Sequence, residues 1–237
     1  MEEQRFNSYL SSHFRKINDL SENGFKKSAR IYLSYYGDVL PKEKNVLILD
    51  IGCGTGQFLY FLEEQGYSNY YGIDASEEQI DFCRKNVTKK VGLADIFEYL
   101  KDKKETFDVV SANDVIEHIP KQRLVETLAL IHGALRKDGV FLMKVPNMSN
   151  PFNLLNRYMD ITHEIGFTEY SICEVLDGVG FSSVAIRNAS YPVVSLKSLL
   201  RRISEVSVHA ALKFLYLAQG NIMPKVLSTN VIAIAKK

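Results

Sequence analysis

The sequence predicts an α/β protein with a doubly wound, mostly parallel sheet. Five short apolar runs alternate with helical patterns between residues 45 and 145, and such alternation is typical of parallel sheets with helices on both faces. The first run ends in an acid and continues into a turn with three alternating glycines. Open α/β sheets bind their ligands at the carboxyl ends of strands, where this turn would lie.

The amino-terminal residues 1–41 are expected to form a helical cap. Apolar residues recur at helical spacing over residues 6–17. A second helix, rich in tyrosine, is expected over residues 25–36, separated from the first by Gly24 and ended by Pro41. Two interpretations stay open: the cap packs on the sheet, or it forms a lid that excludes water from a ligand site.

The first strand is expected over residues 46–51, and the helix after its glycine turn is expected to begin near Gln57. Glycine lets the backbone turn tightly and approach a ligand closely. A dinucleotide-binding turn would need a further glycine at position 57, and a phosphate-binding P-loop would need Lys followed by Ser or Thr; both are absent from the turn. The turn therefore predicts a nucleotide-like cofactor but matches neither of these two phosphate-binding motifs.

Two later strands also end in acids. The run over residues 69–74 ends in Asp74, and the next run ends in Asp95. A carboxylate at such a strand end can accept hydrogen bonds from both hydroxyls of a ribose. Ser76 and Gln79 have the spacing of a helix cap. The other elements are expected as strands at 91–95, 107–112, 139–145 and 182–188, helices at 121–136 and 168–177, and a turn at 137–139.

Residues 45–188 resemble the class I S-adenosylmethionine-dependent methyltransferases, whose motifs occur in the same order and at the same spacings. The resemblance implies a Rossmann-like sheet of seven strands that binds S-adenosyl-L-methionine. It also implies that Asp95 faces the adenine amino group and that the backbone N–H of Ile96 faces a ring nitrogen. Cys53, inside the turn, is not expected to be a nucleophile. The expected cofactor-binding residues are Asp50, Gly52, Cys53, Gly54, Gly56, Phe58, Asp74, Ala75, Asp95, Ile96, Asn113, Asp114 and Val115.

The segment after the fourth strand, residues 113–120, is expected to hold the chemistry. Methyl transfer to a hydroxyl needs an oriented acceptor and a group that takes its proton. His118 has a suitable intrinsic pKa for that role. His163 lies in a later loop that is expected at the same edge of the sheet, so it is the second candidate base.

A metal site is a further interpretation of the same segment. Asp114, Glu117 and His118 have the spacing of one helical face, and His163 would complete the set. Oxygen and imidazole ligands suit Mg²⁺ or Mn²⁺. The set is similar to the metal site of small-RNA 3′-end ribose methyltransferases, except that Asp114 is shorter than their usual glutamate. Three interpretations stay open: this metal site, a metal-free site with a histidine base, and structural hydrogen bonding by Glu117 and His118.

Two further motifs concern the substrate. Asp160-x-Thr162-His163 and Gly180-Phe181 resemble methyltransferases encoded with bacterial surface-polysaccharide genes, which implies transfer to a hydroxyl of a sugar, a glycan or another small molecule. An RNA ribose 2′-O-methyltransferase with a divalent metal and a non-catalytic scaffold stay open. The net charge of +1 argues against DNA and RNA as partners. The acids at the three strand ends argue against a scaffold.

The methyltransferase domain is expected over residues 42–237, with a helical insertion at about 190–224. Within the insertion, residues 195–219 place apolar side chains at helical spacing beside basic ones. This helix is expected either to lie on a membrane surface or to pack on its own domain or a partner subunit. Residues 228–235 are expected to form the last strand, which the resembled fold places antiparallel between the fifth and sixth.

The cysteines at positions 53, 83 and 173 are odd in number and have no ligand spacing, so reduced thiols and a cytoplasmic protein are expected. If the helix of residues 195–219 contacts lipid, the location would be the inner face of the membrane. The sequence contains no signal-peptide pattern and no apolar run of about 18 residues. The oligomeric state is not predicted.

Overall fold

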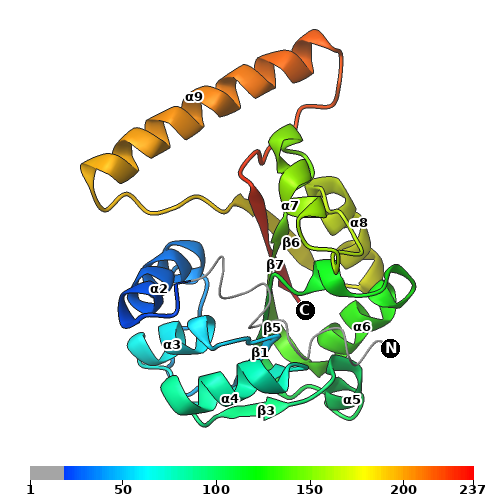
Figure 1. The fold of residues 1–237 in the computed structure, drawn as a ribbon. Coiled ribbons are helices and arrows are strands. Elements are labelled where there is room, and N and C mark those ends of the chain that lie inside the picture. Colours follow the sequence, from blue (N-terminus) through cyan, green and yellow to red (C-terminus); the bar gives the residue numbers. More distant parts are fainter. Residues whose placement is uncertain (1–18) are drawn as a thin grey trace.

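The computed structural model describes residues 19–237, which contain one seven-stranded sheet (Figure 1). The strand order is β3-β2-β1-β4-β5-β7-β6, and only β7 runs antiparallel to its neighbours in this described part. The predicted doubly wound, mostly parallel sheet is confirmed, including its antiparallel last strand. The strands are β1 (Ile48–Ile51), β2 (Tyr70–Asp74), β3 (Val91–Leu93), β4 (Phe107–Asn113), β5 (Leu135–Pro146), β6 (Ser183–Asn188) and β7 (Asn230–Lys236).

Helices cover both faces of the sheet (Figure 1). They are α2 (Glu22–Tyr36), α3 (Gln57–Glu64), α4 (Glu77–Asn86), α5 (Ile96–Leu100), α6 (Leu124–Ala134), α7 (Leu154–Tyr158), α8 (Glu169–Val179) and α9 (Leu196–Ala218). Successive residues of a strand point to opposite faces, so a doubly covered strand is apolar throughout. In β1, Ile48 packs with residues of α2, α3 and α4, whereas Leu49 and Ile51 pack with residues of α5, α6 and α8.

The carboxyl ends of the parallel strands meet at one edge of the sheet. Asp50 in β1 is level with Gly72 in β2 and with Ser111 in β4. This register brings Asp74 and Asn113, the last residues of β2 and β4, beside the glycine turn that follows β1. The strand register therefore gathers the residues that the sequence predicts for the cofactor.

The amino-terminal helix differs from its prediction. Ser21 is the N-cap of α2 and accepts a hydrogen bond from the backbone N–H of Gly24. Gly24 therefore lies inside the first turn of α2, and the prediction that it separates two helices is wrong. The helix expected over residues 6–17 lies outside the described residues.

The connection into β5 also differs. The strand begins at Leu135, which pairs with Phe107, and the pairing resumes at Val140 with an irregularity between. The turn predicted at residues 137–139 is thus a bulge within β5, where Asp138 has a φ of 63°. The helix predicted over residues 121–136 starts with a 3₁₀ turn and ends earlier, because residue 135 is already paired in the sheet.

The helix α9 lies between β6 and β7 in the chain and extends away from the sheet (Figure 1). Ser195 caps it and forms a capping box with Ser198. The predicted helix of residues 195–219 is therefore confirmed. Across the described range 19–237, the helices all fall short of the length and apolarity that a membrane crossing needs.

Candidate active site

A pocket of about 1080 Å³ opens at the carboxyl edge of the sheet. It is lined by all the predicted cofactor-binding residues except Gly56, whose backbone caps α3 behind the pocket wall. Four predicted acceptor-side residues also line it: Asp114, Glu117, His118 and His163. The lining residues that the sequence did not predict include Tyr32, Tyr35, Gln79, Arg123, Lys144, Asn156, Met159 and Tyr191.

Asp74 is fixed by the backbone on either side of it. Its Oδ2 accepts a hydrogen bond from the N–H of Gly54 at 2.8 Å, and its Oδ1 accepts one from the N–H of Ser76 at 2.8 Å. A carboxylate oxygen has two lone-pair directions, so each oxygen can accept a further bond from a ribose hydroxyl. Burial raises the pKa of this carboxyl group, which makes added donors favourable to its charged form.

Only half of the cap predicted for α4 is present. The side chain of Ser76 accepts a hydrogen bond from the N–H of Gln79, as predicted. The side-chain Oε1 of Gln79 is buried without a hydrogen-bond partner in the described residues, so it does not close a capping box. Because Gln79 lines the pocket, this oxygen can accept a bond from a ligand.

Asp95 is the N-cap of α5, and its Oδ1 accepts hydrogen bonds from the backbone N–H groups of Phe97 and Glu98 at 2.8 and 3.2 Å. Ile96 is the first residue of α5, where a backbone N–H has no acceptor within the helix. The structure thus supplies an acceptor and a donor side by side, which suits the edge of an adenine ring. Their contact with adenine stays a prediction.

Asp50 is a nearly enclosed acid, because its exposed fraction is only 2%. Its Oδ1 accepts a hydrogen bond from the hydroxyl of Ser111 at 2.7 Å. Burial raises the pKa of Asp50 to about 7. A carboxylate that is costly to bury favours a cationic ligand beside it, and the amino-acid end of S-adenosylmethionine carries an ammonium group. The residues of this pocket therefore fit that cofactor.

The helix α2 forms one wall of the pocket. The hydroxyl of Tyr36 donates to Oδ1 of Asn113 at 2.7 Å, which fixes the amide and leaves its buried Nδ2 without a partner in the described residues. Tyr32 lines the pocket and contacts Phe58 edge to face, with ring centroids 5.1 Å apart. The described part of the cap, α2, therefore both packs on α3 and lines the pocket, so the two interpretations do not exclude each other for this helix.

Asp114 and Lys144 form an ion pair at the pocket, with Oδ2 and Nζ 2.5 Å apart. Burial disfavours the ammonium group of Lys144, but the charge of Asp114, its hydrogen bond to Lys144 and the nearby Tyr32 and Tyr36 together raise the pKa of Lys144. Asp114 has a φ of 58° and precedes a 3₁₀ turn over Ile116–His118. The prediction that Asp114, Glu117 and His118 share one face of an α-helix is therefore wrong.

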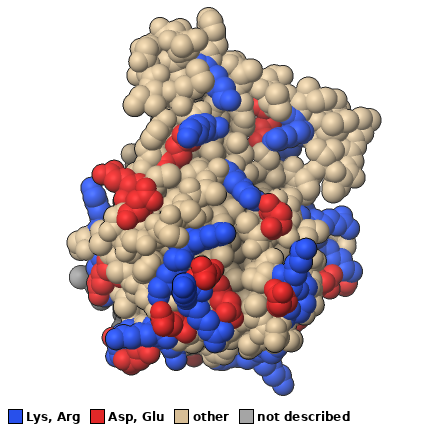
Figure 2. Space-filling model, turned by 180° about the vertical axis from the view of Figure 1, so that it is seen from behind, with Lys and Arg blue, Asp and Glu red and all other residues tan. Residues whose placement is uncertain are grey.

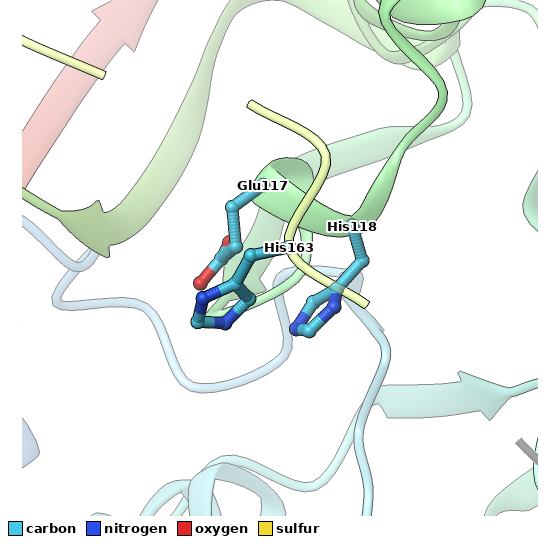
Figure 3. Close-up of side chains that lie close together, drawn as sticks. All are labelled: Glu117, His118 and His163. Carbon is cyan, nitrogen blue, oxygen red and sulfur yellow. The ribbon is translucent and has the colours of Figure 1, made fainter. Parts of the chain in front are cut away.

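Glu117, His118 and His163 form a close cluster (Figure 3). One ligand atom from each lies within 4.8 Å of the others, and the two imidazole rings have centroids 4.7 Å apart. The cluster is held by the main chain, since the N–H groups of Glu164 and Ile165 donate to the carbonyl oxygen of Glu117. Three of the four residues predicted for a metal are thus together, and Asp114 is turned towards Lys144 instead.

A short relay of polar groups fixes the ring of His118. Thr162 donates its hydroxyl proton to Oδ1 of Asp160 at 2.6 Å, so towards His118 Nδ1, 2.8 Å away, it can only accept. The carbonyl oxygen of Thr162, 3.3 Å from Nδ1, is also an acceptor. Nδ1 therefore carries the proton, and Nε2 carries the lone pair.

The same histidine stays neutral at physiological pH. Burial, with the neighbouring His163, lowers the pKa of His118 to about 4. A neutral imidazole can accept a proton or bind a metal, but at this pKa it is a weak base. Thr162 and Asp160 were singled out in the sequence, but their contact with His118, 44 residues away, has no local signal.

The cysteine in the glycine turn has no reactive environment. Cys53 is 5% exposed, and burial raises the pKa of its thiol well above the ordinary value. The thiolate is the nucleophilic form of cysteine, so this environment disfavours attack by Cys53. Its contribution is to line the pocket beside Gly52 and Gly54.

The chain is similar to several methyltransferases. A family described as "Methyltransferase domain" matches residues 5–186. EEF1A lysine methyltransferase 2 of Danio rerio is 27% identical over 145 residues, 55% of this chain and 60% of the relative. Ubiquinone biosynthesis O-methyltransferase of Bartonella quintana is 31% identical over 113 residues, 46% of this chain and 44% of the relative. A SAM-dependent methyltransferase of Archaeoglobus fulgidus has a TM-score of 0.65 at 26% identity, covering 91% of this chain and 97% of that one.

This chain thus spans about 60% of the length of the first relative and 44% of the second. One relative is named for lysine and the other for O-methylation, so their names do not agree on an acceptor. The family match covers more than half of the chain, and the strand-end acids line the same pocket as the glycine turn. This chain belongs to the S-adenosylmethionine-dependent methyltransferases.

Proposed function

We propose that this methyltransferase transfers a methyl group to a hydroxyl of a sugar, a glycan or another small polar molecule. The observation that carries the proposal is the polar acceptor end of the pocket, where His118 and His163 lie in the cavity that also holds the glycine turn. Asp160 and Lys144 add polar groups there. Such a lining suits an acceptor rich in hydroxyl groups better than an apolar one.

The residues of the chain would act on acceptor and cofactor as follows. When bound, S-adenosylmethionine supplies a methyl group on a sulfonium, whose transfer to a hydroxyl yields a methyl ether, S-adenosylhomocysteine and a proton. Asp74 and Asp95 hold the ribose and the adenine. Tyr32 and Phe58 exclude water from the centre of the pocket. His118 and His163 lie where the acceptor loses its proton.

We expect Asp74→Asn to weaken the binding of S-adenosylhomocysteine by about 10- to 100-fold, as isothermal titration calorimetry would measure. Hydrogen bonds to a charged group contribute about 1.5–3 kcal/mol, and the amide cannot accept at both positions. The matched control is Asp81→Asn on the exposed side of α4, which should leave the affinity unchanged. Absence of binding to the folded wild-type protein would contradict the proposal.

A second experiment identifies the acceptor class. Transfer of a labelled methyl group from the cofactor to sugars, RNA oligonucleotides or amines would show which of them the protein methylates.

A second proposal concerns the helix α9, which we propose lies on an anionic membrane surface. The helix contacts the rest of the chain through polar side chains: Tyr216 donates to the carbonyl oxygen of Ser149, and Arg202 and Glu205 both bond to the hydroxyl of Ser190. Its opposite side exposes an apolar stripe at helical spacing. The stripe consists of Leu196, Leu199, Leu200, Ile203, Val206, Phe214 and Leu217, all of them exposed.

The charges of α9 favour lipid over a second copy as the occupant of this stripe. The helix contains four basic residues but a single acid, Glu205. The basic residues are Lys197, Arg201, Arg202 and Lys213. Two such helices pairing through their stripes would bring their basic residues together, whereas a membrane would attract the basic residues through its anionic head groups and bury the apolar face at the acyl-chain boundary. In Figure 2 this end of the molecule is largely uncharged, while Lys, Arg, Asp and Glu are mixed over the body.

The test is flotation with vesicles that contain anionic phospholipid. We expect the wild-type protein to bind them and the double change of Leu200→Glu with Phe214→Glu to bind at least about 100-fold more weakly, since each buried side chain contributes about 1.5–3 kcal/mol. Leu33→Glu, at an exposed leucine of α2, is the control that should bind normally. The proposal is wrong if the wild-type protein does not bind the vesicles. If light scattering then shows a dimer that the double change dissociates, a second copy of the chain covers the stripe instead of lipid.

A further inference from the structure

Glu117 is the most unusual acid among the described residues. It is 1% exposed, and neither carboxylate oxygen has a hydrogen-bond partner in the described part of the chain. Leaving a buried polar group unpaired costs free energy, so such a group in a folded protein calls for an explanation. Because both oxygens lie at the pocket wall among two imidazoles, a bound cation would supply the missing partner.

The two histidines beside it are arranged as ligands rather than as bases. The Asp160–Thr162 relay fixes Nδ1 of His118 as the donor, which leaves the lone pair on Nε2. Metal-binding histidines in proteins commonly have their second nitrogen held in this manner. The buried Nδ1 of His163 also has no hydrogen-bond partner in the described residues. This nitrogen can therefore bind a ligand.

We propose that Glu117, His118 and His163 bind a divalent transition-metal ion, with Mn²⁺ as the reference ion. The inference rests on the proposed methyl transfer and specifies how the acceptor is held. One carboxylate and two imidazoles suit Mn²⁺, Fe²⁺ or Zn²⁺ better than Mg²⁺, which prefers oxygen ligands. Asp114 is excluded from the set, since its carboxylate pairs with Lys144.

The position of the cluster indicates what the ion does. Three protein ligands would leave coordination positions of the ion open, and all three ligand residues line the pocket that the glycine turn also lines. An acceptor hydroxyl bound there would have a lowered pKa and would lose its proton readily at neutral pH. In this arrangement the two histidines hold the ion, and the ion activates the acceptor hydroxyl.

The direct test is calorimetric titration of EDTA-treated full-length protein with Mn²⁺, in the absence of cofactor and acceptor. We expect one ion per chain, and much weaker binding of Mg²⁺. Glu117→Gln and His163→Ala should each abolish the heat of binding. Glu169→Gln, at another buried glutamate that lies outside the pocket and accepts from Lys225 and Val226, is the matched control and should still bind.

The role of the relay has its own pair of variants. Thr162→Val removes the hydroxyl that accepts from Nδ1 of His118 at 2.8 Å and leaves only the longer contact to the carbonyl oxygen, so we expect it to weaken Mn²⁺ binding by about 10- to 100-fold. Thr162→Ser keeps the hydroxyl and should restore the affinity. Equal affinity in both variants would contradict a positioning role for Thr162.

The outcomes separate this inference from the proposed function. Binding of S-adenosylhomocysteine to the EDTA-treated protein tests the function alone. If that binding is intact but Mn²⁺ gives no heat and methyl transfer survives EDTA, the metal site is wrong and the histidines act without an ion. If Mn²⁺ binds and S-adenosylhomocysteine does not, the metal site is supported and the proposed methyl transfer is wrong.

Discussion

Replacing Gly56 with alanine should lower the free energy of unfolding by about 2–5 kcal/mol. Gly56 caps α3 with a φ of 93°, where a residue with a Cβ costs about 1–2 kcal/mol. An added Cβ would also lie 2.5 Å from Sγ of Cys83 and 3.3 Å from Cβ of Val87. Cys83 is fully buried on α4, so the crowding adds about 1–3 kcal/mol. Equilibrium unfolding in urea, followed by circular dichroism, measures the sum.

The control for this prediction is Gly66→Ala. Gly66 has a φ of 82°, but an added Cβ would meet no atom within 4 Å. Alanine at either site restricts the unfolded chain equally, so the comparison cancels that effect. The difference between the two variants, about 1–3 kcal/mol, reports the contact of the turn with α4. Equal losses in the two variants would show that the backbone conformation alone requires glycine at position 56.

Local patterns explain why most of the sheet could be predicted from the sequence. An apolar run that ends in an acid and a glycine turn, as at β1, is set by neighbours in the chain, and the alternation of strands and helices then leaves few topologies. The caps at Ser76, Thr168 and Ser195 are likewise local, and all three begin the helices expected after them.

The parts that could not be predicted depend on contacts between distant residues. Tyr36 reaches Asn113 across 77 positions, and Lys144 in β5 reaches Asp114, which follows the neighbouring strand β4. Lys144 in the sequence is an ordinary polar residue within an apolar strand. The short helix α7 lies in the stretch 147–166, whose apolar residues have no clear period. The departure of Asp114 from its helix depends on a left-handed backbone that aspartate rarely adopts.

Asp50→Asn should remove a pH dependence of stability of about 3 kcal/mol between pH 5 and pH 7. The folded protein raises the pKa of Asp50 to about 7, above the unfolded value of about 4, so in this range the folded state holds a proton that the unfolded state has released. Stability therefore falls by about 1.4 kcal/mol per pH unit as the pH rises, until the folded state also ionises. The difference between variant and wild type isolates this residue, and Asp81→Asn is the control that should show no such slope.

The same residue connects stability to cofactor binding. Ionised Asp50 costs free energy in the ligand-free pocket because only one protein donor, the hydroxyl of Ser111, compensates its burial among the described contacts. An ammonium group bound beside it would favour the charged form, so saturating S-adenosylhomocysteine should flatten the pH dependence of the wild-type protein. The affinity for that ligand should correspondingly fall as the pH drops below 7, and Asn at position 50 should lose this dependence. An unchanged slope in the presence of the ligand would mean that Asp50 does not face the amino-acid end of the cofactor.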